Sequence, residues 1–223
     1  MDLQLRDRVV LVVGGNGFIG SAVASRLTVE GANVVVASRS GDSGIVMNAA
    51  DDLSVADALA GVLAEHRRLD AVVVTAAPSA GTLDQSRNSD PVQVAEAVEA
   101  KALTFLRVAN AVIPVMRDAG YGRIVGISGQ NGRLTGNITG SVRNAALNII
   151  AKNLADELAG TGVTVNTVNP GNVLESPAAE VEHGRGGQSS PSQIADLVAF
   201  LASPLSALSG ESIAIGHRLR GVV

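Results

Sequence analysis

The sequence predicts a doubly wound α/β fold with a parallel sheet of about seven strands and helices on both faces. Short β-rich runs alternate with helical segments along the whole chain, and this order is typical of parallel sheets. The composition agrees, since 46% hydrophobic and 17% charged residues suit strands that are buried on both faces. The 223 residues suffice for one large domain of this kind and are too few for two. We therefore expect a single domain over residues 1–223.

Each strand is predicted from a short run rich in β-branched residues, and each helix from apolar residues at helical spacing. The strands are Val9–Val13, Asn33–Ala37, Ala71–Thr75, Arg123–Ser128, Val163–Asn169 and Ser212–Ile215, with Ile45–Asn48 as a further candidate. The helical series are Ile19, Val23, Leu27; Val55, Leu59, Leu63; Val108, Val112, Met116; and Leu147, Ile150, Leu154. In this architecture ligands bind outside the carboxyl ends of the strands. The segment from Glu175 to Ser190 is rich in Gly, Ser and Pro, which predicts a mobile loop over that site at about 175–190.

The composition excludes several classes of protein. Aromatic residues make up 2% of the chain and the net charge is -4, which argues against a nucleic-acid partner. The absence of cysteine removes disulfides, thiolate nucleophiles and thiol metal sites, so we expect no metal and a cytoplasmic protein. The apolar run Val9–Val13 is too short for a signal peptide or a membrane span. We expect no membrane partner.

A glycine-rich turn joins the first strand to the first helix. The string VGGNGFIG, residues 13–20, contains both GxGxxG and GxxGxxG. Glycines there permit a tight turn and let the backbone approach a pyrophosphate, whose charge the N–H groups at the helix start bind. An ordinary strand-to-helix turn is the alternative interpretation. Because strand, glycines and helix follow in order, the turn predicts a Rossmann-type dinucleotide site made by Gly14, Gly15, Asn16, Gly17, Phe18 and Ile19.

The residues at the end of the second predicted strand indicate which dinucleotide binds. An acid at this place holds the ribose hydroxyls of NAD, whereas an arginine accommodates the 2'-phosphate of NADP. Here Ser38 and Arg39 offer a hydroxyl and a charged guanidinium fork. The sequence therefore favours NADP(H) over NAD(H), the alternative being a solvated Arg39 with Asp42 in another role.

Several longer stretches make the chain resemble the short-chain dehydrogenase/reductase family over nearly its whole length. They are AADDLS, LDAVVVTAAP, YGRIVGIS, VTVNTVNPGNV and VAFLASPLSALSGESIAIG. The resemblance implies an oxidoreductase, and it places the following residues at the cofactor: Asp52 and Leu53 beside the adenine, Ala76 and Ala77 after the fourth strand, and Pro170, Gly171 and Val173 beside the nicotinamide.

The same resemblance shows departures at the family's catalytic positions. The family uses a tyrosine as proton donor, a lysine four residues later, a serine after strand five and an asparagine on the preceding helix. Aligning the run Asn144-Ala145-Ala146-Leu147 puts Gly140 in place of the tyrosine, Asn144 in place of the lysine, Gly129 in place of the serine and Lys101 in place of the asparagine. Tyr121, the one tyrosine of the chain, precedes strand five and therefore lies at the opposite end of the sheet.

Other polar residues near these positions are the candidates for catalysis. Lys101 can supply a charge or a proton, Ser128, Asn131, Arg143 and Asn144 can polarise a carbonyl, and His183 can enter from the predicted loop. The alternative interpretation makes Lys101 and Arg143 solvated helix charges, Asn131 and Asn137 turn residues, and His183 an exposed loop residue. We take Lys101, Ser128, Arg143 and Asn144 as the catalytic candidates.

Three functions fit this combination of an intact cofactor turn and altered catalytic positions. The first is an atypical NADP(H)-dependent oxidoreductase acting on a carbonyl or alcohol group of a small molecule. The second is a non-catalytic NADP(H)-binding protein, either a sensor or a partner subunit, and the third is the same scaffold used for non-redox chemistry. The predicted helices Val92–Arg117 and Arg143–Ala159 correspond to those that pair subunits in the family, which implies a homodimer or homotetramer.

Overall fold

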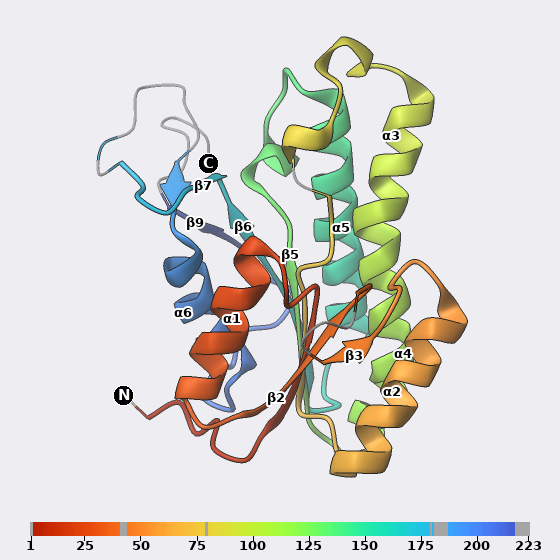
Figure 1. Ribbon diagram of the computed structural model, residues 1–223, viewed down its shortest axis with the longest axis vertical. Helices are drawn as coiled ribbons and strands as arrows, with labels where there is room; N and C mark the ends of the chain where they lie inside the picture. The colour runs from red at the N-terminus through yellow and green to blue at the C-terminus, as the bar shows by residue number, and fades with distance from the viewer. Residues whose placement is uncertain (1, 41–43, 79, 179, 181–186, 217–223) are drawn as a thin grey trace.

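A seven-stranded parallel sheet forms the centre of the molecule, as Figure 1 shows. The computed structural model describes residues 2–40, 44–78, 80–178, 180 and 187–216. The strand order is β3-β2-β1-β4-β5-β6-β9, and every neighbouring pair is parallel. The predicted fold class is thereby confirmed. The strands are β1 (Val9–Val13), β2 (Asn33–Ser38), β3 (Ile45–Val46), β4 (Ala71–Val74), β5 (Gly122–Ile127), β6 (Val163–Pro170) and β9 (Ser212–Ile215).

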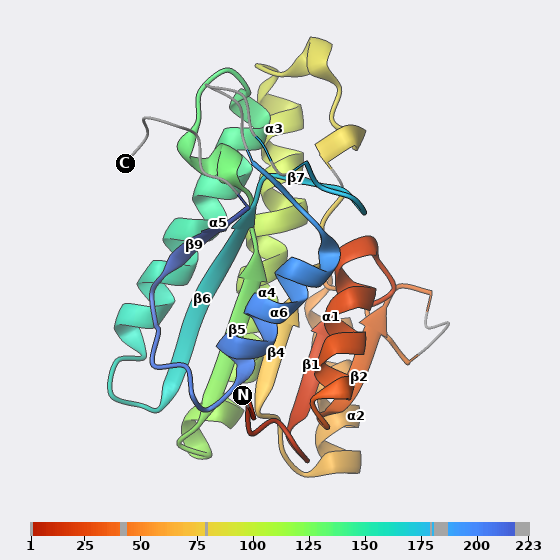
Figure 2. The ribbon, with the colours of Figure 1, turned by 90° about the vertical axis from the view of Figure 1, so that its left-hand side faces the viewer.

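The helices cover both faces of this sheet. On one face α1 and α6 pack side by side, and on the other lie α2, α4 and α5, an arrangement that Figures 1 and 2 show from two sides. The helices are α1 (Phe18–Val29), α2 (Asp52–His66), α3 (Pro91–Val98), α4 (Thr104–Asp118), α5 (Ile138–Glu157) and α6 (Pro191–Ala202). Each face has its own buried apolar cluster, which is the packing that continuous apolar strands require.

The boundaries differ from the predicted ones where local geometry intervenes. The predicted helix over 92–117 is divided, because a π-helical turn (Glu99–Leu103) separates α3 from α4. The predicted helix over 143–159 begins five residues earlier, where Asn137 caps α5 by accepting a hydrogen bond from Gly140 N at 2.8 Å.

The predicted loop over 175–190 is described in part, because residues 179 and 181–186 lie outside the described residues. At its far end β8 (Gln188–Ser189) pairs in parallel with β7 (Asn172–Val173) as a small second sheet. Ser190 then caps α6 through a reciprocal pair of hydrogen bonds with Gln193, and Pro191 takes the first helical position.

None of the helices in the described part of the chain is both long enough and apolar enough to span a bilayer.

Candidate active site

The glycine-rich turn lies where β1 ends and α1 begins, at the carboxyl edge of the sheet. Gly14 has φ +83°, and a Cβ atom there would lie 2.8 Å from the backbone nitrogen of Ala76. A Cβ atom on Gly15 would lie 2.7 Å from a methyl group of Val36, and one on Gly20 would collide with the carbonyl oxygen of Gly14. Side chains are therefore excluded at Gly14 and Gly20 by close packing of the backbone, and at Gly15 by the side chain of Val36.

Hydrogen bonds from two neighbouring strands hold this turn in place. Gly14 N donates to Ala37 O at 2.8 Å, and Thr75 Oγ1 donates to both Val13 O and Gly14 O at 2.9 and 3.0 Å. The N-cap residue of α1 is Gly17, and no side-chain hydrogen bond from the described residues caps this end of the helix. The N–H groups of the first helical turn are therefore left for an anion, so the turn fits the pyrophosphate of a dinucleotide.

The end of β2 adjoins the turn, which places the predicted 2'-phosphate residues beside it. Asn16 Nδ2 donates to Ser38 Oγ at 2.9 Å, linking the turn to the last residue of β2. Arg39 follows directly and is exposed, and no ion pair engages it within the described ranges. Its guanidinium is thus available to a ligand at this edge.

The residues expected beside the adenine lie on α2. Asp52 is the first residue of that helix, and its carboxylate forms an ion pair of 2.8 Å with Arg107 Nε while remaining 85% exposed. Leu53, next to it, is also exposed. Asn48 lies two residues beyond β3 and is exposed, and its Oδ1 accepts a hydrogen bond from Ala50 N at 3.3 Å.

A buried lysine lies at the end of β5. Lys101 belongs to the π-helical turn between α3 and α4, a kind of turn that often occurs at functional sites. Its Nζ donates to the carbonyl oxygen of Ser128, the first residue after β5, at 2.8 Å. The residue is 7% exposed, and burial together with the nearby charge of Arg143 lowers the pKa of Lys101 to about 7.

A second cation, Arg143, is buried beside it on α5. It is 4% exposed, and its Nη1 donates to Pro78 O at 3.2 Å, beyond the end of β4. Its Nε is buried without a hydrogen-bond partner in the described structure, and burial lowers the pKa of the guanidinium. The interpretation of Lys101 and Arg143 as solvated helix charges is therefore wrong.

The remaining catalytic candidates surround these cations. Ser128 Oγ donates to the backbone carbonyl of Asn144 at 3.1 Å, and both residues are buried. Asn144 Oδ1 lacks a hydrogen-bond partner among the described residues. A Cβ atom on Gly129 would lie 3.0 Å from Asn144 Nδ2, and one on Gly140 would lie 2.7 Å from Nδ2 of the cap residue Asn137. Asn131 lies in a short 3-10 helix (Gln130–Arg133), as expected of a turn residue.

The structure places Tyr121, the one tyrosine of the chain, but does not describe His183. Tyr121 lies at the amino ends of the strands, with its ring between the guanidinium groups of Arg8 and Arg123 at 4.6 and 4.3 Å from the ring centre. The prediction that this tyrosine lies away from the cofactor turn is confirmed. His183 lies outside the described residues.

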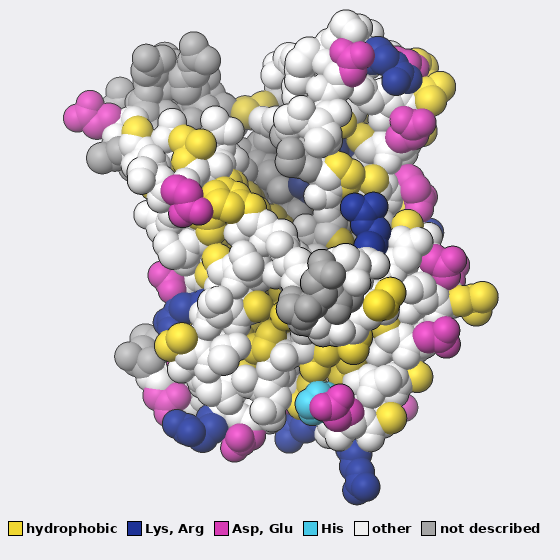
Figure 3. Space-filling view, in the orientation of Figure 1, with side chains coloured by type: hydrophobic (Ala, Val, Ile, Leu, Met, Phe, Trp, Pro, Cys, Tyr) yellow, Lys and Arg dark blue, Asp and Glu magenta, His cyan; other side chains and the backbone are white. Residues whose placement is uncertain are grey.

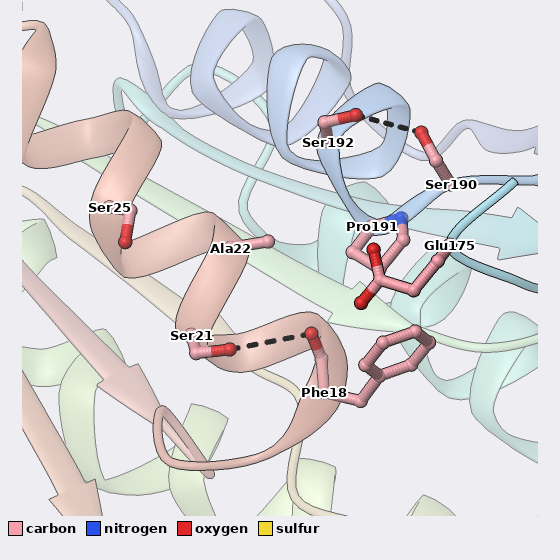
Figure 4. Close-up of a pocket in the computed structure, with 8 residues that line it drawn as sticks. All are labelled: Phe18, Ser21, Ala22, Ser25, Glu175, Ser190, Pro191 and Ser192. Carbon is pink, nitrogen blue, oxygen red and sulfur yellow. Dashed lines mark hydrogen bonds between the residues drawn. The ribbon is translucent and has the colours of Figure 1, made fainter.

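The carboxyl end of β6 lies at the same edge of the sheet as the glycine-rich turn. Pro170 ends the strand, and Gly171 passes so close to the carbonyl of Gly187 that a Cβ atom would collide with it. Val173 of β7 packs against the apolar cluster under α1 and α6. A pocket of about 300 Å³ lies between the starts of α1 and α6. Figure 4 shows the Glu175 carboxylate between the Phe18 ring and Pro191 of this pocket.

The carboxyl edge of the sheet is also where the surface is hollowed. Figure 3 shows a depression between the part of the molecule that carries β7 and the part that carries α3 and the start of α5, with a Lys or Arg side chain visible inside it. The cofactor turn, Lys101 and Arg143 therefore share one end of the molecule, although they lie at different strands. The arrangement offers a neutral anion-binding turn and two buried cations.

Sequence comparisons with known proteins identify relatives of this chain. A family model described as short chain dehydrogenase matches residues 8–185. A dehydrogenase subunit of Thauera aromatica, (2S)-[(R)-hydroxy(phenyl)methyl]succinyl-CoA dehydrogenase subunit BbsC, is 32% identical over 92% of this chain and 91% of its own length. The 3-oxoacyl-[acyl-carrier-protein] reductase FabG of Vibrio cholerae is 28% identical over 95% of this chain and 96% of its own.

Solved structures agree on the fold. The crystal structure of gox2181 has a TM-score of 0.81 and 22% identity, covering 96% of each chain. Levodione reductase also has a TM-score of 0.81, with 20% identity over 96% of this chain and 97% of its own. At such identities these structures support the architecture alone.

Proposed function

Because the chain belongs to the short-chain dehydrogenase family, we propose that it is an NADP(H)-dependent oxidoreductase acting on a carbonyl or alcohol group of a small molecule. Its relatives include one named a 3-oxoacyl-[acyl-carrier-protein] reductase and one named a subunit of a [hydroxy(phenyl)methyl]succinyl-CoA dehydrogenase, and both names support carbonyl and alcohol chemistry. The single observation that carries the proposal is the buried Lys101, whose Nζ donates to the carbonyl oxygen of Ser128 just after β5, on the sheet edge where the glycine-rich turn lies.

The chain offers a complete set of residues for the cofactor. The turn over residues 14–19 would hold the pyrophosphate, Ser38 and Arg39 would hold the 2'-phosphate, and Asp52 and Leu53 of α2 would hold the adenine. Ala76, Ala77 and the segment Pro170–Val173 would hold the nicotinamide end. When bound, NADP(H) supplies or accepts the hydride.

Lys101 takes the part of the proton donor in this proposal. The resemblance to the family puts Gly140, Asn144 and Gly129 at the positions of its tyrosine, lysine and serine. A lysine with a pKa of about 7 is half protonated at neutral pH, which is the condition for efficient proton transfer. In reduction its ammonium gives a proton to the carbonyl oxygen and is then reprotonated from water.

The test is consumption of NADPH with a panel of ketones, aldehydes and quinones, followed by the absorbance of the reduced nicotinamide. We expect turnover above background that falls in Lys101→Met by about 10²- to 10⁴-fold, the usual contribution of a general acid. The chain's other lysine provides the control, because Lys152 is exposed and pairs with Asp156 on α5, so Lys152→Met should leave the rate unchanged. Equal rates for the wild type and Lys101→Met would refute the role of Lys101.

A non-catalytic partner subunit is the second candidate, and one observation favours it. The Thauera relative is named as a subunit of a dehydrogenase, and it covers nearly the whole of this chain. Exposed apolar residues along α5, namely Ile138, Val142 and Ile149, provide a surface for a homodimer, a homotetramer or a related chain. Tight NADPH binding without turnover on the whole panel, together with an oligomeric mass in solution, would favour this function over the first.

A further inference from the structure

Lys101 and Arg143 form a pair of buried positive charges without an anion. Both residues lie below a tenth exposed, and they are close enough for the charge of Arg143 to depress the pKa of Lys101. No carboxylate lies within ion-pair distance of either one in the part of the chain that the structure describes. Buried charges are ordinarily paired, because desolvation of an unpaired ion costs several kcal/mol.

The hydrogen bonds of the two cations leave much of their donor capacity unused. An ammonium has three N–H donors and a guanidinium has five, yet within the described residues each side chain makes a single hydrogen bond, to Ser128 O and Pro78 O respectively. The Nε of Arg143 is buried and has no partner there. Neutral carbonyl oxygens compensate a charge less than a carboxylate does. The pair therefore lacks an acceptor that carries negative charge.

The position of the pair indicates what supplies this charge. Pro78 follows β4 and Ser128 follows β5, whereas the turn that fits the cofactor pyrophosphate follows β1. The phosphates of the cofactor are thus accounted for at another strand. We propose that Arg143, whose buried Nε has no partner among the described residues, binds a carboxylate group of the substrate beside Lys101, so that the protein acts on carboxylate-bearing carbonyl compounds or alcohols. This inference rests on the proposed function, since it names the substrate class of the same site.

Binding can be tested apart from turnover with a matched pair of small molecules. Succinate and succinamide have the same carbon skeleton and differ in charge, so they are added at equal concentration and equal ionic strength to the NADPH-loaded protein. Ligands that bind the folded state raise Tm according to their concentration relative to Kd. We expect succinate to raise Tm by a few degrees and succinamide to have no effect. Equal shifts from the two compounds would overturn the proposal.

Two variants locate the effect. Arg143→Gln should weaken succinate binding tenfold or more, whereas Arg117→Gln, which alters an exposed arginine near the end of α4, should leave it unchanged. Retention of succinate binding in a folded Arg143→Gln protein would overturn the assignment. If that variant does not fold, the comparison of succinate with succinamide on the wild type still decides. Stabilisation by inorganic phosphate but not by succinate would also overturn the choice of a carboxylate.

The outcomes separate this inference from the proposed function. Carboxylate-selective binding without NADPH consumption would sustain the anion site and refute the oxidoreductase. NADPH consumption with neutral ketones, together with equal binding of succinate and succinamide, would sustain the oxidoreductase and refute the anion site.

Discussion

The lowered pKa of Lys101 predicts an unusual dependence of stability on pH. The side chain is buried in the folded protein with a pKa of about 7, whereas the model value for a solvated lysine is 10.5. Between these values the unfolded chain binds more protons than the folded one, so the free energy of unfolding rises as pH rises. Replacing Lys101 by methionine removes this contribution and keeps an unbranched apolar chain of similar length.

The magnitude follows from the two pKa values. Between pH 6 and pH 8 a group with a folded pKa of about 7 and an unfolded pKa well above 8 contributes roughly 1.4 kcal/mol of added stability. For a chain of this size that corresponds to a rise in Tm of about 4 °C. The full effect of Lys101, reached near pH 10, is of order 5 kcal/mol as an upper limit.

The assay compares Tm of the wild type and Lys101→Met by circular dichroism at pH 6, 7 and 8. Buffers without carboxylate or phosphate are used, because an anion bound at Lys101 would raise its pKa and remove the effect. All other ionisable groups are present in both proteins, so the difference in Tm isolates the lysine. Lys152→Met, with its exposed ion pair, should follow the wild type. If the difference in Tm between the wild type and Lys101→Met stays constant from pH 6 to pH 8, the lowered pKa of Lys101 is refuted.

Three further predictions concern other parts of the molecule. Arg39→Asp should shift relative affinity from NADPH toward NADH by tenfold or more in equilibrium binding, and an unchanged ratio would show that this exposed arginine does not meet the 2'-phosphate. Gly14→Ala should abolish NADPH binding and cost about 1–3 kcal/mol in chemical denaturation, because its φ is +83° and its Cβ would meet Ala76 N. Asp70→Asn should lower the free energy of unfolding by about 3 kcal/mol, because it breaks the ion pairs with Arg8 and Arg68. The Kd for NADPH should not change, since these residues lie at the amino ends of the strands, and a large change in Kd would contradict that placement.

The sheet could be predicted from the sequence because its strands are continuous apolar runs with few competing interpretations. Val9–Val13 and Ser212–Ile215 occupy the predicted residues, and the other strand ends shift by at most two. The division of the long helix could not be predicted. The residues Glu99–Leu103 are good helix formers, so neither propensity nor periodicity distinguishes a π-helical turn from the α-helix around it.

The candidate site could be predicted from the sequence only where a short stretch of consecutive residues encodes it. The cofactor turn is encoded locally, by glycines within eight consecutive residues, so sequence alone locates it. The burial of Lys101 and Arg143 depends on how two helices distant in sequence pack at the ends of β4 and β5. Long cationic side chains are ordinarily solvated, and the spacing along either helix carries no signal of burial.

The glycines at the two ends of the site have different physical origins. Gly14 and Gly20 are required by the backbone, because any side chain there would meet fixed main-chain atoms of the turn. Gly140 has no such constraint: its φ lies outside the left-handed region, and the atoms that a Cβ would approach belong to the movable amide of Asn137. The fold would therefore admit a side chain at this position at the cost of one helix cap, about 1 kcal/mol. The glycines of the turn between β1 and α1 are therefore dictated by packing, whereas the fold makes no such demand at Gly140.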